Sequence, residues 1–172
     1  MAAQIEDTLL LEGDTYTLIA CSGGALVHPR QFLMAPVALH GACTRGYYCA
    51  FELDDTHLVL RALTLRCGDN RYLPVAGIEP RVDRRTRSAS YEGLAVRIRY
   101  TGRLRVGLGA VQPRGARRPT GYRSVLDIDV DDGRVDRIID RGDVAPSHAR
   151  VHHASARAPI GKHTTVVLAE LD

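Results

Sequence analysis

The residues best able to do chemistry lie in one ten-residue segment, HGACTRGYYC at positions 40–49. Cys43 follows His40 by three positions and precedes Arg45 by two, and a reactive thiolate needs a base or a cation nearby. Only closeness along the chain supports this pair, so we predict no catalytic residue. Tyrosine and arginine instead give flat, rigid surfaces that form hydrogen bonds. We predict a binding surface made of His40, Arg45, Tyr47 and Tyr48; the alternative is that the tyrosines only fill and flank the core.

Cysteine spacing argues against a zinc ribbon or a redox pair. Cys21, Cys43, Cys49 and Cys67 are 22, 6 and 18 positions apart and form no C-x-x-C motif. We expect free thiols that pack as small apolar side chains. The strand that begins near Gly46 should carry Cys49 away from Cys43 at about 3.3 Å per residue, so no disulfide should join these two.

Histidines do not form a metal-binding pattern either. Four of them fall late in the chain: His148, His152, His153 and His163. Adjacent residues on a strand point to opposite faces, so His152 and His153 could not both bind one ion. Together with His28 or His40, the late histidines could form a metal site on a β-barrel, but the chain lacks the H-x-H pair followed by a carboxylate that such a site would need. We therefore predict no metal and no cofactor.

Charge is distributed unevenly, although the net charge is only +3. Residues 76–123 carry twelve arginines against three acids, while residues 124–143 carry seven aspartates against three arginines. Such asymmetry can mark an anion-binding face. However, Lys162 is the only lysine among 23 basic residues, which indicates a codon preference rather than selection of each arginine. No aromatic residues are interleaved with the arginine-rich segments at residues 81–87 and 114–118, so nucleic-acid binding is disfavoured.

An apolar period of two dominates the chain and predicts β-strands. The expected strands lie at residues 16–21, 46–53, 57–66, 95–108, 125–130, 135–139 and 163–171. Turn signals at residues 54–56 and at Asp132-Gly133 predict two hairpins. No stretch of twelve residues shows helical periodicity with a cap. About nine short strands predict a single all-β domain over residues 1–172, an antiparallel β-sandwich or a partly closed β-barrel with little helix.

The segment from Ala95 to Leu108 should form a hairpin of its own. A three-residue loop, Thr101-Gly102-Arg103, places Tyr100 opposite Leu104 and keeps one face of the hairpin apolar. A two-residue loop would mix the two faces. Because a buried face fixes register, the longer loop is favoured.

The opposite face of this predicted hairpin is basic. It carries four arginines, which form our candidate face for an anion or a partner: Arg97, Arg99, Arg103 and Arg105. Like charges directly across a strand pair are destabilising, so this face needs compensating anions. We predict that the strand at residues 124–130 lies beside the hairpin, with Asp127 or Asp129 paired to one of these arginines.

Three motifs occur in a fixed order: CTRGYYCAFEL at residues 43–53, YTGRLRVG at 100–107 and YRSVLDIDVDDGRV at 122–135. This order resembles a family of small bacterial all-β proteins, in which an R-G-Y motif opens a strand, a T-G-x-L hairpin follows, and a D/N-G-x-V hairpin comes last. The resemblance covers roughly residues 14–140. It implies a bacterial, cytoplasmic, all-β protein and transfers no activity and no residue role.

These observations lead to two hypotheses about function. The first is a non-enzymatic protein-binding module, such as an immunity-like or accessory factor. The alternative is a small, cofactor-independent β-barrel enzyme of the cyclase, isomerase or lyase type that acts on a small apolar substrate. An enzyme of this kind should enclose a pocket of several hundred Å³ with tyrosine or arginine inside it, whereas a binding module should have a filled interior.

The sequence also predicts where the protein acts. No apolar run approaches the roughly 20 residues that span a bilayer. The first residues show neither the basic start nor the apolar stretch of a secretory signal. We therefore expect a cytoplasmic protein with no membrane partner.

Overall fold

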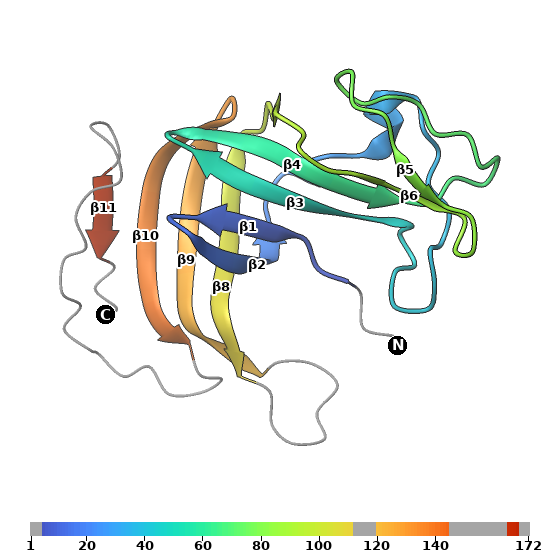
Figure 1. The fold of residues 1–172 in the computed structure, drawn as a ribbon. Coiled ribbons are helices and arrows are strands. Elements are labelled where there is room, and N and C mark those ends of the chain that lie inside the picture. The colour runs from blue at the N-terminus through green and yellow to red at the C-terminus, as the bar shows by residue number, and fades with distance from the viewer. Residues whose placement is uncertain (1–4, 112–119, 145–164, 169–172) are drawn as a thin grey trace.

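The structure is a computed structural model that describes residues 5–111, 120–144 and 165–168. Among these residues the only helical element is a short 3₁₀ helix, η1 (Pro29–Phe32), and no helix is long and apolar enough to cross a membrane. The strands are β1 (Thr8–Leu11), β2 (Asp14–Cys21), β3 (Tyr47–Asp54), β4 (His57–Leu65), β5 (Arg81–Asp83), β6 (Ser88–Tyr91), β7 (Val96–Arg97), β8 (Gly102–Val111), β9 (Gly121–Asp131), β10 (Arg134–Val144) and β11 (Thr165–Leu168) (Figure 1). The predicted all-β fold with little helix is confirmed.

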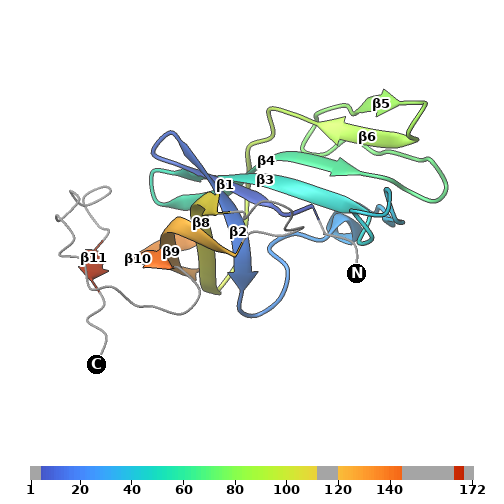
Figure 2. The same cartoon turned by 90° about the horizontal axis from the view of Figure 1, so that it is seen from below.

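Seven strands form a ring in the order β4-β3-β1-β2-β8-β9-β10 (Figures 1 and 2). The ring closes where the start of β10 meets the start of β4, through the pair Arg134–His57. Next to this pair, the Leu58 N–H donates to the Gly133 carbonyl at 2.8 Å, and the Val135 N–H donates to the Thr56 carbonyl at 2.7 Å. The sheet is mixed rather than purely antiparallel, because β1 runs parallel to β3.

Apolar side chains from all seven strands fill the ring. They belong to one buried cluster: Leu9, Leu11, Tyr16, Leu18, Phe51, Leu58, Leu60, Leu104, Val106, Leu126, Ile128, Val130, Val135 and Ile138. Leu60, Leu104 and Ile128 are fully buried. The alternation seen in the sequence therefore selects the inward-facing residues correctly.

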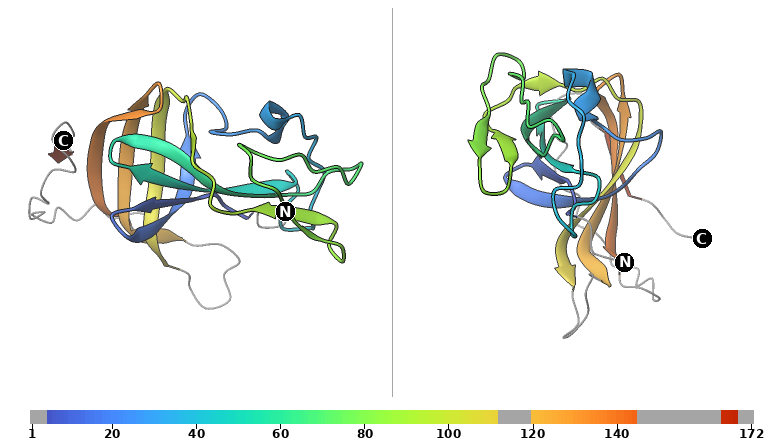
Figure 3. Two further views of the ribbon diagram at one scale, coloured as in Figure 1. Left: turned by 45° about the horizontal axis from the view of Figure 1, so that its top comes forward. Right: turned by 90° about the vertical axis from the view of Figure 1, so that its right-hand side faces the viewer.

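Beyond β4 the sheet continues outside the ring. There β6 and β5 lie near η1, and together with the loops at residues 25–46 and 66–92 they form an extension that we call the arm (Figures 1 and 3). The β1–β2 and β3–β4 hairpin tips lie at the end of the molecule opposite the arm (Figure 1). The molecule therefore has two distinct ends joined by the long strands β3 and β4.

Two of the predicted hairpins are confirmed. Strands β3 and β4 pair from Tyr47–Leu65 to Asp54–His57, and β9 pairs with β10 around the turn Asp132-Gly133. Asp132 and Gly133 both have positive φ angles, 44° and 83°, as a type I′ turn requires. A Cβ atom at Gly133 would lie 2.1 Å from the Ile98 carbonyl oxygen, so only glycine fits where the ring closes.

The predicted hairpin at residues 95–108 is wrong. Strand β7 pairs with β4, and β8 pairs instead with β2 and β9. The intervening segment crosses the end of the ring, where the Tyr100 hydroxyl donates to the Ser22 carbonyl and the Gly133 N–H donates to the Tyr100 carbonyl. Tyr100 and Leu104 are both buried as expected. Alternation thus identified the apolar face but not the strand that pairs with it.

The last predicted strand, at residues 163–171, lies partly outside the described residues. Strand β11 covers Thr165–Leu168 and pairs in parallel with β10 at the edge of the sheet.

Candidate protein-binding surface

The two tyrosines of the 40–49 segment point to opposite sides of β3. Tyr47 is buried in the core, where its hydroxyl donates to the Val27 carbonyl at 3.2 Å and its ring meets the edge of the His28 ring. Tyr48 is half-buried on the outer face, across from Thr64 of β4. Of the two tyrosines, only Tyr48 is partly exposed to solvent.

A groove of about 210 Å³ lies beside Tyr48 on the outer face of β1, β3 and β4. Small, uncharged side chains form much of it. Its lining consists of Ile5, Glu6, Thr8, Tyr48, Cys49, Ala50, Ala62 and Thr64. Glu6 is the only charged residue among them. The outer faces of exposed sheets usually carry polar or charged residues, so a floor of alanine and threonine beside a tyrosine is a surface suited to an apolar partner group.

An ion pair holds one wall of this groove in place. The Asp7 carboxylate is buried, and its Oδ1 accepts hydrogen bonds from Arg45 Nη2 at 2.5 Å and from the Cys49 N–H at 2.6 Å. Burial of Arg45 opposes its charge, but the Asp7 carboxylate outweighs this and raises the pKa of the guanidinium. Asp7 thereby ties the segment that carries Glu6 and Thr8 to the start of β3.

Arg45 also positions the start of β3 itself. Its Nε donates to the Tyr47 carbonyl at 2.6 Å, and its guanidinium lies 4.8 Å from the centre of the Tyr47 ring. The preceding turn depends on Gly46, which has a φ of +83° and whose Cβ, if present, would lie 2.2 Å from the Val37 carbonyl oxygen. Arg45 is thus a positioning residue beneath the groove rather than part of its lining.

The predicted binding set is therefore divided by the structure. Tyr48 lines the groove, Arg45 supports it, and Tyr47 belongs to the core. His40 lies in the exposed loop before β3, where its Nδ1 accepts from the Ala42 N–H at 3.2 Å. Asp7, which no sequence pattern indicated, is the residue that sequence analysis missed.

The cysteines do not form a catalytic centre among the described residues. All four are free thiols, in agreement with the expectation for Cys43 and Cys49. The Cys43 thiol donates to the Tyr47 carbonyl at 3.4 Å and has no hydrogen bond with His40. Burial raises the pKa of the Cys21 and Cys49 thiols, which disfavours the reactive thiolate.

The predicted pairing of the acidic strand with the arginines is confirmed. Strand β9 lies beside β8, with Asp127 across from Arg105 and Asp129 across from Arg103. Both arginines donate two hydrogen bonds to the facing carboxylate, at 2.7 and 2.9 Å for Arg105 and at 2.6 and 3.0 Å for Arg103. Arg99 pairs in the same way with Asp132.

Asp127 is the centre of this charged surface. Its side chain is fully buried, and Arg141 of β10 provides a second cation at 2.9 Å. The hydrogen bond from Arg105 outweighs the effect of burial and, with Arg141, lowers the pKa of the carboxyl group. These arginines have anions within the chain itself, so they do not require an external one.

Arg97 does not belong to this surface. It lies on β7, pairs through its backbone with Val59 of β4, and is exposed. The four arginines predicted to share one face are therefore split between two parts of the sheet.

No group of three or more metal-ligating side chains occurs in the part of the chain that the structure describes. The late histidines, His148, His152, His153 and His163, lie outside it.

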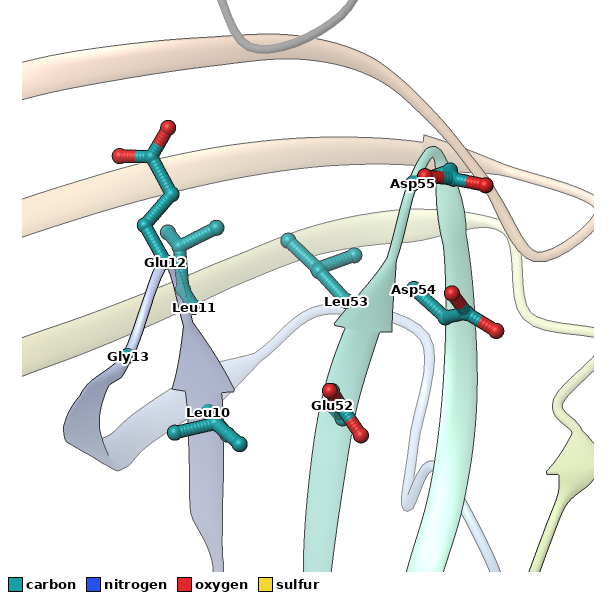
Figure 4. A pocket seen from close by; sticks show the side chains of 8 residues that line it. All are labelled: Leu10, Leu11, Glu12, Gly13, Glu52, Leu53, Asp54 and Asp55. Carbon is teal, nitrogen blue, oxygen red and sulfur yellow. The ribbon is translucent and has the colours of Figure 1, made fainter.

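A second cavity, of about 320 Å³, lies between the β1–β2 and β3–β4 hairpin tips (Figure 4). It is lined by Leu10, Leu11, Glu12, Gly13, Glu52, Leu53, Asp54 and Asp55. Among the described residues, no tyrosine or arginine lines this cavity. It therefore differs from the pocket expected of the enzyme hypothesis, in which such residues orient a substrate.

Comparisons with protein-family models, with curated proteins and with solved structures found no match. The resemblance to a family of small bacterial proteins therefore stays an expectation based on the three motifs alone.

Proposed function

We propose that this protein is a non-enzymatic protein-binding module that engages its partner through the groove beside Tyr48. The observation that carries the proposal is the combination of a half-buried tyrosine with a floor of Ala50, Ala62 and Thr64 on the outer face of a sheet. Tyrosine is one of the residue types enriched at the energetically dominant centres of protein interfaces, and the small side chains beside Tyr48 leave its ring room for a partner group.

The rigidity of the groove supports the same role. Its floor consists of paired strands, and its wall is held by the half-buried ion pair of Asp7 with Arg45. A surface that is already ordered loses little conformational entropy when it binds. The filled interior of the ring also favours a binding module over an enzyme with an apolar lumen.

The groove also indicates the chemistry of the partner. Its floor fits an apolar side chain, and Glu6 at its edge fits a neighbouring lysine or arginine. We infer that the partner presents an apolar group flanked by a cation. We propose that this interaction takes place in the bacterial cytoplasm, in an immunity-like or accessory role; the four free thiols support a reducing compartment.

The test begins with capture of a partner from lysate of the source cells, followed by affinity measurement with the purified partner. In Ala62→Arg, a long side chain fills the floor of the groove without entering the core. The matched control is Ala110→Arg, at an exposed position near the end of β8. We expect Ala62→Arg to weaken binding at least tenfold, or about 1.4 kcal/mol, and the control to bind as the wild type does. Equal binding by both variants would exclude the groove.

A further inference from the structure

Leu33 is a surface residue whose exposure and backbone conformation are both unfavourable for leucine. It follows η1, the residue is 86% exposed, and its backbone is left-handed, with a φ of 60°. A left-handed residue after a helix is normally glycine or asparagine. Leu33 therefore combines a strained backbone with an exposed, large apolar side chain. Strained residues tend to cluster at functional sites.

The chain on either side holds Leu33 firmly in this position. Its N–H donates to the Arg30 carbonyl at 3.0 Å, and the next residue, Met34, donates to the Pro29 carbonyl at 3.2 Å. Pro29 and Met34 are both buried. Leu33 is therefore presented outward by anchored neighbours.

The cavity between the hairpin tips offers a matching recess. The parallel pairing of β1 with β3 extends to Leu10–Glu52. Just beyond this pair, Leu11 and Leu53 line the space between the two hairpins (Figure 4). Three leucines thus supply apolar walls to a cavity of about 320 Å³.

The rim of this cavity is acidic and unneutralised. Glu12, Asp54 and Asp55 form no ion pair with any residue that the structure describes, whereas Glu52 pairs with Arg61. Leu33, in turn, shares its turn with Arg30, whose side chain is exposed. An exposed leucine beside a cation thus matches a leucine-lined cavity with an anionic rim.

These two features lie at opposite ends of the molecule, on the arm and at the hairpin tips (Figures 1 and 3). One molecule cannot bring them together. We propose that the chain associates head to tail with a second copy, so that Leu33 of one copy occupies the cavity between the hairpin tips of the next. Such a contact joins two different surfaces, so each added copy leaves one leucine and one cavity free unless a ring closes. This interaction is independent of the groove beside Tyr48.

Sedimentation velocity over a concentration series in low salt gives the first test. The wild type should increase in mass with concentration, and Leu33→Asn should remain a monomer. Asparagine suits a left-handed backbone, so this variant should melt no earlier than the wild type. The control is Val111→Asn, which removes another exposed apolar side chain, near the end of β8, and should associate as the wild type does. A wild type that stays monomeric at millimolar concentration overturns the proposal, as does a Leu33→Asn variant that still associates.

A mixing experiment distinguishes this contact from any other interface. The double variant Glu12→Lys/Asp54→Arg reverses charge on the rim but keeps Leu33, whereas Leu33→Asn keeps the rim. Each should be monomeric alone, and an equal mixture should form dimers only, because one intact leucine then meets one intact cavity. If the wild type associates but the mixture stays monomeric, the head-to-tail contact is wrong.

Discussion

Two charged surfaces of this molecule differ in how their carboxylates are matched. On the outer face of β8 and β9, Asp127 and Asp129 lie directly across from arginines and bind them through two hydrogen bonds each. At the hairpin tips, Glu12, Asp54 and Asp55 form no ion pair with any described residue. The contrast shows that a charged stretch of sequence needs no external ligand where strand pairing brings opposite charges together.

Among variants that test this contrast, Asp127→Ala should cause the largest loss in the free energy of unfolding. The substitution leaves Arg105 and Arg141 facing each other around a fully buried position without their shared anion. The substitution removes the hydrogen bonds that both guanidiniums donate to a buried carboxylate, and we expect a loss of about 3 kcal/mol in the free energy of unfolding. Urea denaturation measures it.

The matched control for this variant is Asp129→Ala, which removes a more exposed carboxylate with one arginine partner. Asp129→Ala should lower the free energy of unfolding clearly less than Asp127→Ala does, because solvent screens exposed ion pairs. Equal losses in the free energy of unfolding for the two variants would show that burial of Asp127 does not determine how much its ion pairs stabilise the fold.

Acid should weaken the matched surface. The arginines lower the pKa of the Asp127 and Asp129 carboxyl groups in the folded state, below an unfolded value of about 3.9. Their contribution is therefore fully present above that unfolded pKa and is lost as the pH falls through the lower folded values. Urea midpoints measured between about pH 6 and about pH 3 should decrease less steeply in Asp127→Asn than in the wild type. Identical slopes would contradict the assignment.

The smallest effect should come from the unmatched surface. Neutralising the rim with Glu12→Gln/Asp54→Asn removes like charges that have no described cation partner. The free energy of unfolding should therefore stay the same or increase slightly. Thermal melting of the variant checks this. A clear fall in melting temperature would reveal that these carboxylates stabilise the hairpin tips, and the contrast between the two surfaces would then fail.

The alternation of residue types predicted much of the fold. It identified the inward-facing side chains, the β3–β4 and β9–β10 hairpins, and the placement of Asp127 beside an arginine. Strand partners beyond a tight turn could not be predicted in this way. Residues 98–101 cross the end of the ring instead of forming a hairpin. Hydrogen bonds of Ile98 and Tyr100 with Leu58, Gly133 and Ser22, which are distant in the sequence, hold this segment there.

The candidate site was less predictable than the fold. Tyr48 was identified from its residue type and its neighbours, but the role of Asp7 depends on Arg45, which lies 38 positions away along the chain. No periodic pattern links residues so far apart. Leu33 was missed for a different reason. Its exposure accompanies a left-handed backbone after a helix of only four residues, and no sequence pattern predicted that helix.

The measurement that tests the central claim most directly compares the affinity of the purified partner for two variants. Tyr48→Ala alters the groove, whereas Arg97→Ala/Arg99→Ala alters exposed arginines of the face first predicted from sequence. If the groove binds the partner, Tyr48→Ala weakens the complex at least tenfold, about 1.4 kcal/mol, and the arginine variant binds as the wild type does. Undiminished binding by Tyr48→Ala, with a loss in the arginine variant, would contradict the account.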